Sequence, residues 1–119
     1  MPILEVEVVG EVSAPLRHGL AQRLADAAGQ VFESAPQQTW IKLRSLHALD
    51  YAENAGLAPA PLPIFVRVLL RSALVVEERR RIADELARAV AEVCARPVAR
   101  VHILFEEPGQ GRIAFGGKL

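Results

Sequence analysis

The feature that most constrains the fold of this chain is an internal repeat. Sliding the sequence against itself by 62 residues aligns its two halves without a gap. The matched pairs are Leu24 with Leu86, Ala25 with Ala87, Val31 with Val93, Ala52 with Ala114, and Leu57 with Leu119. Such matches between hydrophobic segments are common. Stronger evidence for a repeat is that the predicted strands and helices of the two halves align without a gap. The chain is therefore predicted to be one domain of two copies, residues 1–57 and 63–119, joined by the stiff proline-rich connector "LAPAPLP".

Each copy has the pattern of a strand, a helix and a second strand. In the first copy, Val6 and Val8 alternate with glutamates, which is typical of a strand with one buried face. Apolar residues at helical spacing then predict one continuous helix over 13–32, with Ser13 as its N-cap and Leu16 on its buried side. Alternation over 39–46 predicts the second strand.

The second copy repeats this order. Strands are predicted over 63–72 and 99–107, and a helix over 76–95. The residues expected to face inward are Val66, Val68, Leu70, Ile82, Leu86, Val90, Val93, Val101, Ile103 and Phe105. The single cysteine, Cys94, lies on the apolar side of the helix and is interpreted as a small core residue.

Two such units with right-handed crossovers predict an α+β fold, a four-stranded mixed sheet with both helices on one face. The other face would carry a mixed set of side chains: Glu5, Glu7, Trp40, Lys42, Arg44, Arg67, Leu69 and His102. This set is too polar for a dry core and too apolar for a free surface, so partial burial against other subunits is expected. Glu5 and Glu7 are expected to form cross-strand ion pairs with Lys42 and Arg44.

Composition excludes several classes of protein. The 14 basic and 14 acidic residues cancel, and no basic cluster alternates with aromatic residues, so nucleic acid is not expected as a partner. The arginine run at 79–81 lies within the predicted helix and is interpreted as a solvated face. No stretch is apolar enough to cross a membrane, and no signal peptide precedes the domain, so a cytoplasmic protein is expected. No two histidines have metal-ligand spacing.

The second residue of the chain has two interpretations. Proline is tolerated at the start of a strand because no ladder donor is lost there. If Met1 is removed, however, Pro2 supplies the only secondary amine that a protein can have at its terminus. Removal of Met1 is therefore a condition for any chemistry at this nitrogen.

Taken together, Met1–Pro2, the doubled strand–helix–strand unit and the ending "GRIAFGGKL" resemble the tautomerase superfamily. The second half is similar to 4-oxalocrotonate tautomerase, and the whole chain resembles a fused, double-length member. The resemblance implies a tautomerase-like fold, a homotrimer, a small carboxylate substrate and no cofactor or metal. It also implies that Pro2 is the general base or acid in an enol–keto conversion of a 2-oxo or 2-hydroxy unsaturated acid.

The remaining site residues follow from the same resemblance. Arg71 is expected to hold the substrate carboxylate, and Tyr51 or a backbone amide to stabilise the developing enolate. Trp40 and His102 occupy positions where the family has an arginine, and Lys42 is a second candidate cation. Val12 and Leu74 stand at the family's loop arginine positions, so the usual carboxylate clamp is incomplete.

Three alternatives stay open at this point. Within the same superfamily, a protonated Pro2 could serve a dehalogenase of the hydratase type or a decarboxylase. The replaced arginines are also compatible with a non-catalytic binding module that keeps only the fold.

Overall fold

The structure, a computed structural model, describes residues 2–56 and 61–119. Met1, most of the connector and the match of Leu57 with Leu119 lie outside the described residues. The strands are β1 (Ile3–Val9), β2 (Trp40–Leu46), β3 (Ile64–Leu69) and β4 (Val101–Phe105). The helices are α1 (Ala14–Arg17), α2 (Leu20–Val31) and α3 (Val76–Cys94), with short 3-10 turns η1 (Ala48–Asp50) and η2 (Val98–Arg100). Among the helices described, none has the length and apolarity needed to span a membrane.

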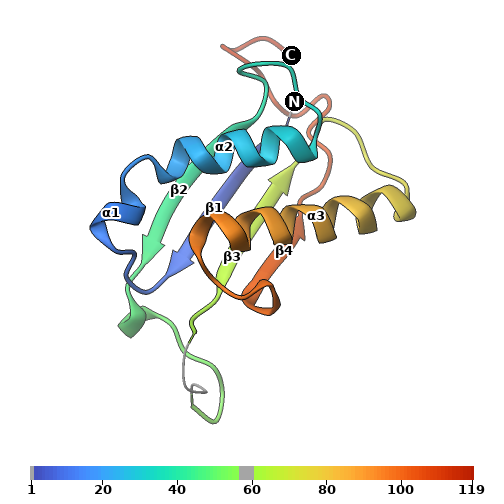
Figure 1. Cartoon of the computed structure of the whole chain (residues 1–119). Coiled ribbons are helices and arrows are strands. Elements are labelled where there is room, and N and C mark those ends of the chain that lie inside the picture. The colour runs from blue at the N-terminus through green and yellow to red at the C-terminus, as the bar shows by residue number, and fades with distance from the viewer. Residues whose placement is uncertain (1, 57–60) are drawn as a thin grey trace.

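The four strands form one mixed sheet in the order β2-β1-β3-β4. β1 runs parallel to β2, and β3 runs parallel to β4, while β1 and β3 meet antiparallel at the centre. α2 and α3 lie side by side on one face of this sheet (Figure 1). The predicted α+β fold with both main helices on one face is therefore confirmed.

The two units also share their strand register. Ile3 pairs with Trp40 in the first unit, and Phe65 pairs with His102 in the second. Each residue of the second pair lies 62 positions after its counterpart in the first. The offset that aligns the two halves of the sequence therefore also relates their backbone pairing.

The core lies between the sheet and the two long helices. Alternate residues of β1 and β3 are buried beneath α2 and α3, as the period-two patterns predicted. The fully buried side chains include Leu4, Val6, Val8, Leu20, Leu24, Ile64, Val66, Val68 and Leu86. Cys94 is buried as expected, and its burial raises the pKa of the thiol. β2 and β4 form the sheet edges, and most of their inward residues are only half-buried.

The prediction of a single helix over 13–32 is wrong. The chain forms one turn, α1, and then breaks at Gly19, whose φ of 72° belongs to the left-handed region that favours glycine. Leu16 is consequently only half-buried in a separate turn, whereas Leu20 begins the buried face of α2. Ser13 stands before α1 but makes no side-chain cap hydrogen bond.

The face of the sheet opposite the helices carries ion pairs between strands. Glu5 accepts a hydrogen bond from Lys42 at 2.9 Å, as predicted, and the pKa of the Glu5 carboxyl is lowered by this contact. The second predicted pair, Glu7 with Arg44, is in register, but these side chains form no ion pair within the described part of the chain.

A second polar network lies beyond the carboxyl end of β2. Glu53 accepts hydrogen bonds from the Tyr51 hydroxyl at 2.7 Å and from Arg100 at 2.8 Å. Arg100 also donates to the carbonyl of Pro61 at 3.0 Å. These bonds tie the loop after β2 to the turn that precedes β4. The tyrosine hydroxyl and the carboxylate are therefore both occupied by hydrogen bonds within the chain.

This network predicts an unusual titration of the chain's one tyrosine. Ionising Tyr51 breaks its hydrogen bond to Glu53 and places two negative charges together, so its pKa is raised above 10.0. Glu53→Gln is expected to lower this pKa toward 10.0, while Glu106→Gln should leave it unchanged. Tyrosinate absorbance during alkaline titration measures it directly. An unaltered curve in Glu53→Gln would show that the hydrogen bond does not persist in solution.

Candidate active site

The amino end of β1 places Pro2 between β2 and the residue that follows β3. The antiparallel register pairs Ile3 with Leu69, so Pro2 lies across from the residue that follows β3. On the other side, the backbone N–H of Trp40 donates to the carbonyl of Pro2 at 3.0 Å. Pro2 is buried at this point and lines a cavity of about 460 Å³. Its position is therefore set by hydrogen bonding to β2 and by pairing with β3.

Arg71 lines the same cavity as Pro2. It follows the end of β3, and its carbonyl accepts a hydrogen bond from Gln110 at 3.0 Å, while Leu70 accepts one from Gly109 at 2.8 Å. These two bonds fix the backbone of Arg71 against the C-terminal segment. Over residues 2–56 and 61–119, the Arg71 guanidinium forms no ion pair, so its charge remains available.

A second cavity, of about 400 Å³, adjoins the first at Arg71 and Gln38, which line both. Its other walls come from the C-terminal segment, including Ile113, Phe115 and Lys118. The ending "GRIAFGGKL" forms an isolated antiparallel bridge there, between Phe115 and Lys118. The C-terminal segment lies at the same end of the sheet as the start of β1 (Figure 1).

Another cation of the first cavity is already neutralised. Arg81 lines it from α3, but its guanidinium bonds to Glu78 and, at 2.8 Å, to Glu85. These carboxylates raise the pKa of Arg81, and Arg81 lowers that of Glu78. Arg71 is therefore the better candidate for binding a carboxylate.

Two of the predicted site residues lie on β2 and do not line the Pro2 cavity. The Trp40 ring packs edge-on against Phe115, with centroids 5.8 Å apart, and its Nε1 donates to the carbonyl of Gln37 at 2.9 Å. It therefore supports the wall of the second cavity. Lys42 lies on the outer sheet face in its ion pair with Glu5.

The other two lie at the opposite end of the sheet. Tyr51 follows β2, which runs parallel to β1 and so ends far from Pro2. His102 is near the start of β4, where its ring lies 5.5 Å from that of Phe65, and the Phe65 ring lies 6.0 Å from Tyr51. Within one chain, the structure does not bring Tyr51 or His102 to Pro2.

Sequence reasoning missed Gln38 and Lys118. Gln38 immediately precedes β2, and a parallel partner of β1 must begin at the same edge of the sheet as Pro2, so its place was predictable from topology. The position of Lys118 depends on how the C-terminal segment folds back, and the hydrophobic pattern of the sequence does not indicate this. Leu74 contributes an apolar wall to the Pro2 cavity, and Val12 packs against the core.

The described residues include no group of three or more histidine, cysteine or acidic side chains placed to hold a metal ion. The arrangement near Pro2 instead offers a buried proline, an unpaired guanidinium and a carboxamide around adjoining cavities. Such a set can bind an oxygen-rich anion next to the proline.

No protein-family model matches the sequence. No curated protein matches it significantly.

Several solved structures have nearly the same chain path. A fused 4-OT that forms a symmetric trimer has a TM-score of 0.78 at 19% identity, over 98% of this chain and 94% of its own. The protein Pt0534, inactivated by 2-oxo-3-pentynoate, has a TM-score of 0.78 at 20% identity, with the same coverage. FG41 malonate semialdehyde decarboxylase, inhibited by 3-bromopropiolate, has a TM-score of 0.68 at 19% identity over 88% of this chain and 82% of its own. The chain therefore has the fold of these structures, which is the fold that the resemblance in its sequence implied.

Proposed function

We propose that this protein is a cofactor-independent tautomerase in which Pro2, freed by removal of Met1, transfers a proton on an unsaturated 2-oxo or 2-hydroxy acid. The observation that carries the proposal is that Pro2 and Arg71 line one cavity of about 460 Å³. A basic nitrogen and a carboxylate-binding cation are the minimum that this chemistry needs in one place.

The physical chemistry of a terminal proline suits this role. A free α-amino group titrates at roughly 7.7–8.0. Burial and a nearby positive charge each disfavour a protonated amine, and Pro2 is buried with Arg71 in the lining of the same cavity. A base whose pKa lies near the working pH transfers protons efficiently. The ring and the hydrogen bond from Trp40 hold Pro2 in a fixed direction.

The proposed reaction moves one proton and leaves the rest of the substrate intact. The Pro2 nitrogen takes the proton from the enol oxygen, and the electrons of the O–H bond form the ketone as the double bond shifts. The same proton then returns to carbon, which restores the free amine. Arg71 would hold the carboxylate bidentately, and the Gln38 carboxamide would donate to the oxygen that carries the developing charge. Gln38 takes the part first assigned to Tyr51, which lies at the other end of the sheet in the same chain.

A similar structure supports this substrate class. Pt0534 is inactivated by 2-oxo-3-pentynoate, an unsaturated 2-oxo acid. A carboxamide is not a base, so Gln38 itself cannot activate water; a hydration mechanism would have to use Glu33, whose carboxylate also lines the Pro2 cavity. Malonate semialdehyde decarboxylase shares the fold, which makes decarboxylation the outcome to check first if enol–keto conversion is absent.

The central test is an enol–keto assay with phenylenolpyruvate and 2-hydroxymuconate on protein whose intact mass lacks one methionine. Pro2→Ala, which replaces the secondary amine with a primary one, is expected to remove most of the activity. Alkylation by a bromo-oxo acid should add one label per chain, at Pro2. Retained Met1, a label elsewhere, or full activity in Pro2→Ala would refute the proposal and leave the binding-module alternative.

Arg71→Ala is expected to weaken substrate binding much more than folding. A hydrogen bond to a charged group contributes about 1.5–3 kcal/mol, so KM should rise roughly tenfold to hundredfold. The thermal midpoint should hardly move, because Arg71 is exposed and unpaired. Arg80→Ala, an exposed arginine of α3, is the matched control.

Gln38→Leu should show the opposite kinetic pattern in the same assay. Loss of a donor to developing charge is expected to lower kcat with little change in KM. Gln30→Leu, on the exposed side of α2, controls for the substitution itself. If Arg71→Ala and Gln38→Leu both leave the kinetics unchanged, the carboxylate is held elsewhere, with Lys118, which lines the adjoining cavity, the next cation to substitute.

We also propose that three chains assemble into a closed ring. The outer sheet face is mixed in character, and exposed apolar side chains flank it, among them Trp40, Leu104 and Phe115. The fused 4-OT structure is a symmetric trimer, and cyclic symmetry closes such an interface without leaving free edges. Only in an assembly could Tyr51 and His102 of one chain approach Pro2 of another.

Light scattering at micromolar concentration is expected to give the mass of three chains. Leu104→Lys places a charge on the exposed edge strand β4 and should shift the population toward monomer, whereas Leu49→Lys, on the exposed η1 turn, should not. A wild-type monomer at this concentration would contradict the proposal and confine the active site to one chain.

A further inference from the structure

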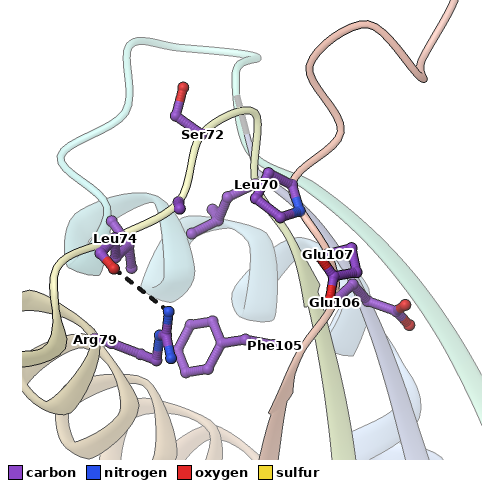
Figure 2. A pocket seen from close by; sticks show the side chains of 9 residues that line it. Leu70, Ser72, Leu74, Arg79, Phe105, Glu106 and Glu107 are labelled. Carbon is purple, nitrogen blue, oxygen red and sulfur yellow. Dashed lines mark hydrogen bonds between the residues drawn. The ribbon is translucent and has the colours of Figure 1, made fainter.

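A third cavity, of about 270 Å³, lies between the β3–α3 loop and the end of β4 (Figure 2). It shares Leu70, Ser72 and Leu74 with the wall of the Pro2 cavity, but neither Pro2 nor Arg71 lines it. The loop therefore separates two hollows at the same end of the sheet, and the proposed reaction uses only one of them.

One side of this cavity presents a guanidinium that no carboxylate neutralises. Arg79 lies over the Phe105 ring, 6.0 Å from its centroid, and donates to the Leu74 carbonyl at 3.4 Å (Figure 2). In the described ranges it forms no ion pair, whereas Arg81 and Arg88 of the same helix are each bonded to an acidic residue one turn away. All three arginines of the run at 79–81 are exposed, as predicted for a solvated face, and Arg79 in addition lines this cavity with most of its N–H groups free.

The opposite side of the cavity presents a carboxylate that likewise has no ion-pair partner. Glu107 lines the cavity, and its backbone is held by the bonds from Glu106 to the Val68 carbonyl at 2.9 Å and from Gly109 to the Leu70 carbonyl at 2.8 Å. Its neighbour Glu106 is paired with Arg67 at 2.6 Å, but Glu107 makes no ion pair with any described residue. Arg79 and Glu107 stand on opposite sides of the hollow in Figure 2.

A cation and a carboxylate that line one cavity without meeting are complementary to a ligand that carries both charges. We propose that this cavity binds a small zwitterion, an α-amino acid with a short aliphatic side chain. Its carboxylate would accept from the fork of Arg79, and its ammonium would donate to Glu107. The aliphatic side chain would contact the apolar wall formed by Leu70, Leu74 and Phe105. The volume of about 270 Å³ is large enough for a ligand of the size of a single amino acid.

This inference does not rest on the proposed tautomerase activity. Binding is read without turnover, and none of the groups assigned to proton transfer lines the cavity. Arg71→Ala should therefore leave amino-acid binding intact, so the two proposals can fail separately.

Isothermal titration with L-valine tests the proposal on the unmodified protein. Isovalerate and isobutylamine keep the branched carbon skeleton but carry only one of the two charges. Each should bind roughly tenfold to hundredfold more weakly than L-valine, because each loses one charged hydrogen-bonding group. This comparison needs no variant and so cannot be confused by misfolding.

Variants then assign the two charges. Arg79→Gln should abolish the advantage of L-valine over isobutylamine, and Glu107→Gln its advantage over isovalerate. Arg80→Gln and Glu77→Gln, exposed on the first turns of α3 and outside the cavity, should change neither. The proposal is overturned if L-valine, L-alanine and glycine all fail to bind, if valine and its one-charge analogues bind equally, or if Arg79→Gln and Glu107→Gln bind valine as the wild type does.

Discussion

The rest of the structure depends on the antiparallel pairing of β1 with β3. This pairing joins the two strand–helix–strand units into one sheet and places buried residues of both strands under α2 and α3. It also sets the site, because the register that pairs Ile3 with Leu69 brings Pro2 to the residues that follow β3. A shift of one residue would exchange the buried and exposed faces of the strand, so the core holds this register firmly. The pairing of β1 with β3 therefore determines both the packing of the core and the position of Pro2 at the site.

Much of the fold was predictable from the sequence, because each correct element had a strong periodic signal. Alternation located all four strands, and the spacing of Ile82, Leu86 and Val90 located α3. The error over 13–32 arose because Gly19 interrupts the helix without interrupting the apolar spacing between Leu16 and Leu20. Helical periodicity records which residues are apolar, and it does not detect a single residue with positive φ.

The candidate site was less predictable, because its members meet through topology rather than through motifs. Pro2 and Arg71 were both foreseen, and they line one cavity, but the chemical roles assigned to them remain proposals. Tyr51 and His102 were assigned from the resemblance of the sequence to a family, and strand direction alone places them at the other end of the sheet. The sequence also does not show which arginines are paired. Of Arg71, Arg79 and Arg81, only Arg81 is bonded to carboxylates in the described chain.

The repeat gives the two ends of the sheet equivalent backbone pairing, but the polar side chains at the two ends are arranged differently. At the first end, Gln38 precedes β2 next to an unpaired Arg71, and the polar groups there face open cavities. At the second end, the position 62 residues after Gln38 is Arg100, which is bonded to Glu53 and Pro61. The counterpart of Pro2 there is Ile64, a mid-chain residue that can never offer a free amine. Both halves contribute to the one core, but only the first carries the proline on which the proposed reaction depends. The hydrogen bonds of Arg100 to Glu53 and Pro61 therefore tie loops together at the end of the sheet that the proposed reaction does not use.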